Sequence, residues 1–269
     1  MLVRTWNLFH GNTKPPQRRA FLEEMIRLAT ADDPDLVCLQ EVPAWAIGRL
    51  EEWSGMAERH ALAARPVLGP LPIPATLGRA LTAPNHGLFR SAFAGQGNAI
   101  LVRRGLRILA ESRIVLNPRR FRAAQSRWLG LDLVARLAWA KERRVCHAVR
   151  VASTDNKTVL VVNMHCTSYP PDQRLPDAEL LRAATFATSV AEPDDVVVLA
   201  GDFNVSFLRS RTLHDLCGLE WGFSQAGPGI DHVLVRGAPA EPPHRWPDAR
   251  REREGRLLSD HSPVEVTFA

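Results

Sequence analysis

The sequence predicts an α/β or α+β fold in a single domain, and three observations support this. Short apolar segments typical of buried strands alternate with a few amphipathic helices along all 269 residues. The chain is 45% hydrophobic and 23% charged, a composition typical of a globular protein with a substantial core. No linker or tandem repeat interrupts the pattern, so we expect residues 1–269 to form one domain.

The predicted strands are short apolar runs bounded by turn residues. Their aliphatic and β-branched side chains favour extended backbone. A turn-like tetrad at 154–157 separates two of these runs and predicts a strand pair. The predicted strands are 2–6, 35–40, 98–102, 145–151, 158–163, 196–200, 230–235 and 264–268.

Three segments predict helices because their apolar residues recur at helical spacing. They are 17–30, 119–140 and 177–191, and Pro34 breaks the pattern after the first of them. Two further segments, 61–87 and 237–255, are rich in Gly, Pro or charged residues, and we expect irregular loops there.

The net charge of +5 is unevenly distributed. Residues 101–150 contain 13 Arg and Lys against Glu111, Asp132 and Glu142, a net charge of +10, whereas the remainder of the chain carries −5. An anionic substrate would respond to this field. Only three of the 34 basic residues are lysine, and this Arg-rich composition favours a bacterial origin with a GC-rich genome.

Nothing in the sequence predicts a membrane span or a secretory signal. No apolar run approaches the roughly 20 residues that a span requires, and the first residues lead directly into a predicted strand. Cys38, Cys146, Cys166 and Cys217 form no short metal-binding spacing, so we expect free thiols in the cytoplasm.

Polar residues that can bind metals recur at the ends of the predicted strands. Each alone is more typical of a turn or of a structural histidine, but six such sites in one chain point to a common centre. Hard oxygen ligands suit Mg²⁺, Mn²⁺ or Ca²⁺, and no P-loop, GxGxxG, HExxH or GxSxG motif suggests other chemistry. Hydrolysis by activated water is the chemistry that such residues support. The sites are Asn7, Glu41, Asn163 with His165, Asp202 with Asn204, Asp231, and Asp260 with His261.

An ordered set of motifs resembles the endonuclease/exonuclease/phosphatase (DNase I-like) superfamily. The set comprises Thr5-Trp6-Asn7, Gln40-Glu41, Gly97-Asn98-Ala99, Asn163-Met164-His165, Gly201-Asp202-Phe203-Asn204, Ile230-Asp231-His232 and Ser259-Asp260-His261. The resemblance implies a four-layer α/β sandwich of two packed mixed β-sheets flanked by helices, with the active site at one end. The histidine in Asn163-Met164-His165 resembles the DNase I, phosphatase and sphingomyelinase branches rather than the abasic-site endonucleases, which usually have Tyr-Val-Pro-Asn there.

The resemblance also implies a role for each matching residue. Metal ligands would be Glu41, Asn7 and Asp260, holding Mg²⁺, with Mn²⁺ as a substitute. Asp202 would orient or deprotonate the attacking water, and Asn204 would hold the water or a phosphate oxygen. The substrate phosphate would meet His261, oriented by Asp231, while His165 would stabilise the transition state or protonate the leaving oxygen. Asn98 and Asn163 would be further substrate contacts.

We expect the substrate to bind in or near the basic helical segment around 117–144. Arg113, Arg119, Arg120, Arg122 and Arg127 could follow a nucleic-acid backbone, with Trp128 and Trp139 available for stacking. The same segment could be a solvated helix face that packs its tryptophans inward, or a helix that touches an anionic membrane. Just beyond its helix, Arg144 is a candidate contact to the substrate phosphate.

These observations favour a monomeric metal-dependent nuclease acting on DNA or RNA. One alternative is a phosphatase or phospholipid phosphodiesterase, similar to enzymes acting on inositol phosphates or sphingomyelin. A non-catalytic binding module is a remote alternative, because Glu41, Asp202 and His261 are all retained.

Overall fold

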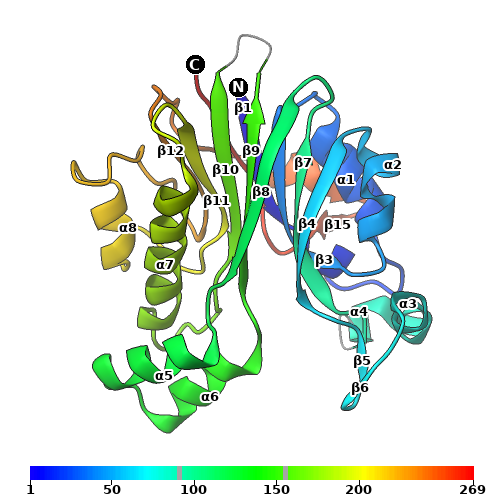
Figure 1. Cartoon of the computed structure of the whole chain (residues 1–269). Helices are drawn as coiled ribbons and strands as arrows, with labels where there is room; N and C mark the ends of the chain where they lie inside the picture. Colours follow the sequence, from blue (N-terminus) through cyan, green and yellow to red (C-terminus); the bar gives the residue numbers. More distant parts are fainter. Residues whose placement is uncertain (90–92, 154–156) are drawn as a thin grey trace.

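A computed structural model of the chain describes residues 1–89, 93–153 and 157–269. Two mixed β-sheets pack face to face, and helices cover the outer face of each (Figure 1). The predicted four-layer α/β sandwich is therefore confirmed. Both termini lie at one end of the sandwich, while α5, α6 and the β5–β6 hairpin lie at the other.

The first sheet has six strands, and the N-terminal strand lies near its centre. β1 pairs in parallel with β3 and antiparallel with β16. Across the sheet the order is β13 (His244–Arg245), β16 (Val264–Thr267), β1 (Leu2–Asn7), β3 (Leu36–Pro43), β7 (Gln96–Val102) and β4 (Ala57–Ala64).

The second sheet has five strands, of which β10 and β11 are parallel neighbours. The predicted hairpin pairs as expected, with Thr158 opposite Ala152, although residues 154–156 of its turn lie outside the described part of the chain. Across the sheet the order is β12 (Asp231–Arg236), β11 (Val196–Asp202), β10 (Thr158–His165), β9 (Val145–Ala152) and β8 (Arg107–Val115).

Central strands are apolar on both faces because each face is covered. In β10, Val159 and Val161 pack between the sheets, whereas Leu160 and Val162 pack against the helical layer. This is the period-2 alternation of side chains, with both sets buried. A continuous apolar run is therefore what the sequence shows for this strand.

Separate helices build the two outer layers. α1 and α2 cover the six-stranded sheet, and α7 and α8 cover the five-stranded sheet. The α-helices are α1 (Leu22–Thr30), α2 (Leu50–Ser54), α3 (Ala75–Thr82), α4 (His86–Phe89), α5 (Arg119–Trp128), α6 (Leu133–Lys141), α7 (Arg174–Val190) and α8 (Arg211–Leu216). In the described residues, no helix has both the length and the apolar character that a membrane crossing would require.

Several predicted elements need correction. The single helix predicted over 119–140 is two helices, because Gly130 adopts a left-handed φ of 61° between them. The edge strand β8 was not predicted, since its side chains are mostly exposed and mainly polar or charged in its second half. The first predicted helix begins at Leu22 rather than at residue 17.

The two predicted loops contain short regular elements. Residues 61–87 include the end of β4, the hairpin of β5 (Val67–Leu68) and β6 (Leu71–Pro72), and then α3. Residues 237–255 contain β13 and β14 (Glu252–Arg253). A small third sheet joins β14 to β15 (Arg256–Leu258) and β2 (Thr13–Lys14).

Candidate active site

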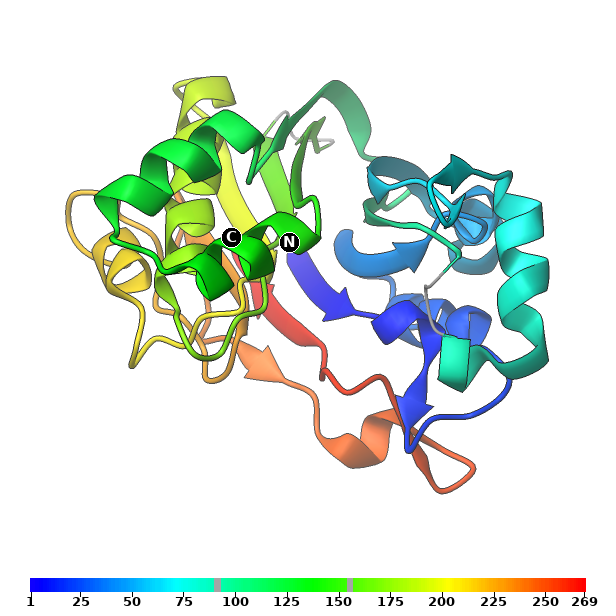
Figure 2. The same ribbon diagram turned by 90° about the horizontal axis from the view of Figure 1, so that it is seen from below.

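Strand ends from both sheets bring the site residues together at the end of the sandwich opposite the termini. Because β1 and β3 are parallel, as are β10 and β11, each pair ends at the same edge of its sheet. β12 runs antiparallel to β11 and therefore begins there, with Asp231 opposite Asp202. Viewed from this end, the green helices α5 and α6 and the cyan segment lie on opposite sides of the blue strand β1 (Figure 2).

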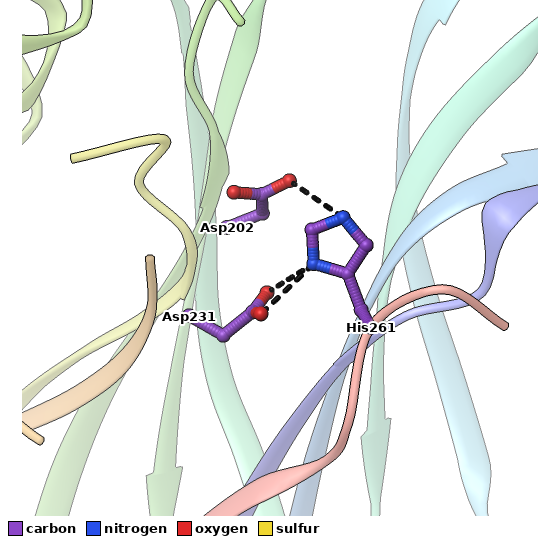
Figure 3. A group of neighbouring side chains, drawn as sticks. All are labelled: Asp202, Asp231 and His261. Atoms are coloured by element: carbon purple, nitrogen blue, oxygen red, sulfur yellow. Dashed lines mark hydrogen bonds and ion pairs between the residues drawn. The ribbon is translucent and has the colours of Figure 1, made fainter. Parts of the chain in front are cut away.

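His261 lies between two carboxylates (Figure 3). Its Nδ1 donates to Asp231 at 2.8 Å, and its Nε2 lies 3.8 Å from Asp202 Oδ2. Burial lowers the pKa of His261, but the hydrogen bond to Asp231 and the charges of Asp202 and Asp231 outweigh it and raise the pKa to about 10. The ring is therefore an imidazolium at neutral pH, oriented by Asp231.

Asp202 is buried at the centre of the cluster. Its Oδ2 accepts a hydrogen bond from Asn7 at 3.0 Å and lies 3.5 Å from His165 Nε2, while its Oδ1 accepts the backbone N–H of Asn204 at 3.0 Å. Burial, followed by the negative charge of Asp231, raises the pKa of Asp202 to about 7. A carboxylate with a pKa near neutrality can accept a proton from water and release it again.

Glu41 is the ionised carboxylate of the site. Its Oε2 lies 3.0 Å from His10 Nε2, and its Oε1 accepts from Asn7 at 3.4 Å. Burial alone would raise the pKa of Glu41, but the charge and hydrogen bond of His10, with the charge of Arg144, lower it well below its usual range. Of these two carboxylates, Glu41 therefore stays charged at neutral pH, whereas Asp202 can exchange a proton.

Arg144 contacts His165 inside the site. Its Nη1 lies 3.1 Å from each ring nitrogen of His165, and its Nη2 pairs with Glu142 at 2.8 Å. The buried Nε of Arg144 has no hydrogen-bond partner among the described residues. Burial, reinforced by the charge of Arg144, lowers the pKa of His165 well below its usual value, so this imidazole is neutral.

A pocket of about 300 Å³ opens over these groups. Polar residues from both sheets and from the end of α6 form its wall, which therefore combines carboxylates, imidazoles and a guanidinium. The lining residues are Phe9, Glu41, Ala138, Lys141, Glu142, Arg144, His165, Thr167, Ser168, Asp202, Asn204, Asp260 and His261.

Backbone strain is concentrated around this pocket. Glu41, Asn204 and Ser259 have φ values of 54°, 53° and 62°, a left-handed conformation that non-glycine residues rarely adopt. Such strain persists only where the surrounding structure imposes it, and it is characteristic of functional sites. Ser259 Oγ donates to the carbonyl of Asn7 at 2.7 Å and thereby joins the loop before His261 to the end of β1.

Two predicted substrate contacts, Asn98 and Asn163, form hydrogen bonds between the sheets. Asn163 is fully buried; its Nδ2 donates to the carbonyls of Leu39 and Ala99, and its Oδ1 accepts from Gln40 at 2.8 Å. Asn98 Nδ2 donates to the carbonyl of Val145 at 3.1 Å. Neither lines the pocket, and both connect the two sheets, which favours a structural role, while the predicted substrate contact stays a prediction.

The structure also reveals site residues that sequence reasoning missed. His10 contacts Glu41 at 3.0 Å, and its position three residues after Asn7 was the signal that could have identified it. The fully buried carboxylate of Glu179 accepts from Trp139 Nε1 at 2.6 Å and from Thr167 N at 2.6 Å. Glu179 thereby joins α6 to the pocket wall, a role that helical periodicity could not indicate.

Oxygen donors on one side of the pocket fit a hard divalent cation. Glu41 is charged, and Asp260 is partly exposed at the same pocket. The Asn7 side chain lies beside them, with its Nδ2 donating to Glu41 and its Oδ1 accepting from the backbone N–H of Phe9 at 3.0 Å. Ligand atoms of Asp202, Asp231 and His261 also lie within 4.8 Å of one another, but an imidazolium paired with Asp231 cannot bind a metal. The donor chemistry therefore favours the Glu41 side.

Solved structures share this fold. A functionally unknown conserved protein from Enterococcus faecalis V583 is 17% identical, with a TM-score of 0.67, and the match covers 100% of this chain and 99% of that one. A D. rerio TDP2 humanised by 14 mutations is 14% identical with a TM-score of 0.65 (100% and 98% covered), and a mannosyl-6-phosphatase of Bacteroides thetaiotaomicron VPI-5482 is 16% identical with a TM-score of 0.63 (100% and 99% covered). No curated protein shows a significant match.

Residues 5–261 match the model of the Endonuclease/Exonuclease/phosphatase family. The matched segment includes Asn7, Glu41, Asp202 and His261, whose side chains meet at the open end of the sandwich. Members of this family are phosphoesterase hydrolases that generally use a divalent metal. The chain therefore belongs to the endonuclease/exonuclease/phosphatase family.

Proposed function

We propose that the chain is a metal-dependent hydrolase that cleaves a phosphodiester with activated water. The observation that carries this proposal is the position of Asp202, buried beside His165 at 3.5 Å and His261 at 3.8 Å at the edge of a pocket that also contains Glu41. A proton acceptor, an imidazolium and an ionised carboxylate are the groups that hydrolysis of a phosphoester requires.

Asp202 is the proposed general base. Its pKa of about 7 matches proton exchange with water near neutral pH, and Asn7 and the Asn204 backbone fix its two oxygens. The Asn204 side chain lines the pocket and donates to the carbonyl of Cys166 at 3.0 Å. Its amide oxygen is then available to orient the water that Asp202 deprotonates.

Positive charge on the opposite side of Asp202 stabilises the anionic transition state. The imidazolium of His261 and the guanidinium of Arg144 both line the pocket, where they can contact non-bridging phosphate oxygens. His165 is neutral and can donate one N–H bond to the transition state. Of its two predicted roles, the low pKa favours stabilisation of the transition state over protonation of the leaving oxygen.

Glu41, Asp260 and Asn7 are the proposed ligands of Mg²⁺, for which Mn²⁺ could substitute. When bound there, the cation would supply Lewis-acid stabilisation of negative charge on the phosphoryl group. His10 holds one oxygen of Glu41 and helps to keep this carboxylate ionised. The protein thus provides a charged ligand before any cation arrives.

Nucleic acid was the substrate class that the sequence favoured, and the structure supports only part of the predicted binding track. Arg119, Arg120 and Arg127 are exposed, as that track requires. Trp139, however, is fully buried and bonded to Glu179, so among the two predicted stacking residues only Trp128 is exposed. We therefore keep DNA or RNA as a second candidate beside a membrane-borne phosphodiester.

A substrate panel tests the proposal. We expect wild type to hydrolyse at least one of bis(4-nitrophenyl) phosphate, single-stranded DNA, duplex DNA, RNA, inositol phosphates or sphingomyelin. EDTA should abolish this activity and Mg²⁺ or Mn²⁺ should restore it, while Asp202→Ala should remain inactive with either metal. Hydrolysis that survives EDTA or Asp202→Ala would contradict the proposed mechanism.

A further inference from the structure

Two projections flank the active-site pocket beyond the ends of the sheets (Figures 1 and 2). The helical rim consists of α5 and α6, and the end of α6 supplies Ala138 and Lys141 to the pocket wall. The hairpin rim consists of β5, β6, α3 and α4. His86 of α4 donates through Nε2 to the carbonyl of His10 at 2.8 Å, and His10 contacts Glu41. Both projections are thus connected to the catalytic groups.

The helical rim exposes a row of large apolar side chains. Leu133, Val134 and Leu137 of α6 are 69%, 64% and 63% exposed, while Ala135 and Trp139 on the opposite side of the helix are buried. Residues three and four apart lie on one face, so Val134 and Leu137 adjoin the pocket-lining residues Ala138 and Lys141. The apolar surface therefore continues to the pocket mouth.

The hairpin rim is apolar as well. Leu71 of the hairpin is 65% exposed, and Val67 and Leu68 beside it are also exposed. Leu77 of α3 and Leu88 of α4 extend the surface, and Leu88 is 73% exposed only two residues after His86. Soluble surfaces carry single exposed apolar residues routinely, but two groups of them on either side of one pocket indicate a contact surface.

The helical rim is basic as well as apolar, and the hairpin rim carries no acidic residue. The sequence has no acidic residue between Glu58 and Glu111, a stretch that contains the whole hairpin rim. Residues 112–141 contain Asp132 as their single acid. The exposed basic residues of the helical rim are Arg119, Arg120, Arg127, Arg136 and Lys141.

We propose that the two rims dock the open end of the sandwich onto an anionic lipid surface, where the pocket receives a phosphodiester of that surface. The docking is inferred from the exposed residues of the two rims alone, whereas the substrate assignment rests on the proposed hydrolase function. Basic residues attract anionic headgroups, and exposed leucines and valines enter the boundary between headgroups and acyl chains. A nucleic acid would use the arginines but would leave these aliphatic side chains in water.

Co-sedimentation with vesicles tests the docking. The vesicles contain phosphatidylcholine with about 30% phosphatidylserine, and pure phosphatidylcholine serves for comparison. We expect wild type to bind the anionic vesicles, and Leu133→Ser/Leu137→Ser to bind at least about tenfold more weakly. Leu219→Ser is the matched control, because Leu219 is fully exposed but lies outside both rims, and it should bind as wild type does.

Each outcome decides the inference. Equal binding of Leu133→Ser/Leu137→Ser and wild type would overturn it, as would binding of wild type to a DNA duplex without binding to the vesicles. Hydrolysis of soluble bis(4-nitrophenyl) phosphate separates this inference from the proposed function. The double variant should hydrolyse this substrate at the wild-type rate. A wild type that binds vesicles but hydrolyses no phosphoester would refute the proposed function and leave the docking intact.

Discussion

One layer of polar side chains lies between the sheets and a second lies at the pocket, and the two differ in almost every physical property. The inner layer, Gln40, Asn98 and Asn163, is neutral and tightly hydrogen-bonded between the sheets. The outer layer is Glu41, Asp202, Asp231 and His261. The pKa values of Glu41, Asp202 and His261 are shifted, and Glu41 has a left-handed φ of 54°. The contrast is sharpest at neighbouring residues, since Gln40 donates to the opposite sheet while Glu41 faces the pocket.

This contrast shows that a polar residue at a strand end has two distinct uses. Between the two sheets, the side chain forms hydrogen bonds with buried backbone groups and fixes the spacing of the sheets. At the pocket, the side chain lies beside charged groups and is not fully hydrogen-bonded, so it can still bind a ligand or exchange a proton. Substitutions in the outer layer should therefore reduce activity, and those in the inner layer should reduce stability.

The largest loss of activity is expected for Asp202→Asn. The amide keeps the shape of the carboxylate but cannot accept a proton, so kcat should fall by about 10²–10⁴. The variant also removes a buried charge beside Asp231, and its melting temperature should equal or exceed that of wild type. Hydrolysis of bis(4-nitrophenyl) phosphate and thermal unfolding together check this. A variant that is less stable yet active would place Asp202 in the inner layer.

The opposite result, a loss of stability with little loss of activity, is expected for Asn163→Leu. Loss of the side-chain amide removes the hydrogen bonds that Asn163 donates to the carbonyls of Leu39 and Ala99 and the one it accepts from Gln40, all in the buried interior. The free energy of unfolding in urea should fall by about 2–4 kcal/mol. At a temperature where the variant is folded, its kcat should stay within about threefold of wild type, because Asn163 is outside the pocket. A large loss of kcat without a loss of stability would restore the substrate role predicted from the sequence.

A smaller effect on activity is expected for Asp231→Asn. His261 loses the partner that orients it and raises its pKa, so kcat should fall by about 10–100-fold. Nuclear magnetic resonance titration should place the pKa of His261 in the variant well below the wild-type value of about 10. An unchanged pKa would mean that Asp231 does not hold this imidazolium.

The same pair predicts a pH dependence of stability. The folded-state pKa of His261 is raised above its unfolded value of 6.5, so its protonation stabilises the fold fully below that pH and the contribution is lost as pH rises through about 10. Melting temperatures of wild type should therefore decline over this range, and those of Asp231→Asn should decline less. Parallel curves for the two proteins would contradict the ion pair.

Much of the fold and of the outer layer could be predicted from the sequence, for physical reasons. Buried strands of a covered sheet are continuous apolar runs, so the central strands were predicted correctly. Glu41 and Asp202 lie at the ends of such runs and His261 shortly before one, and the structure places all three at the pocket. Their proposed roles await the experiments described above.

The errors arose where long-range contacts decide the outcome. Asn163 and His165 lie on the same strand with the same local pattern, and only the packing of the opposite sheet places Asn163 inside and His165 at the pocket. Trp128 and Trp139 likewise differ in exposure, because Trp139 is held inside by its hydrogen bond to Glu179 of α7. The strand β8 escaped detection because an exposed edge lacks a continuous apolar run.

Calorimetric titration of Mg²⁺ tests the central claim, that the outer layer is the chemical centre, most directly. Wild type and Asn163→Leu should bind the cation with the same affinity, since the inner layer does not contact it. Glu41→Gln should lose most of this affinity, because a neutral amide replaces the charged ligand. If Glu41→Gln binds Mg²⁺ as wild type does, the outer layer is not the metal centre and the proposed mechanism is wrong.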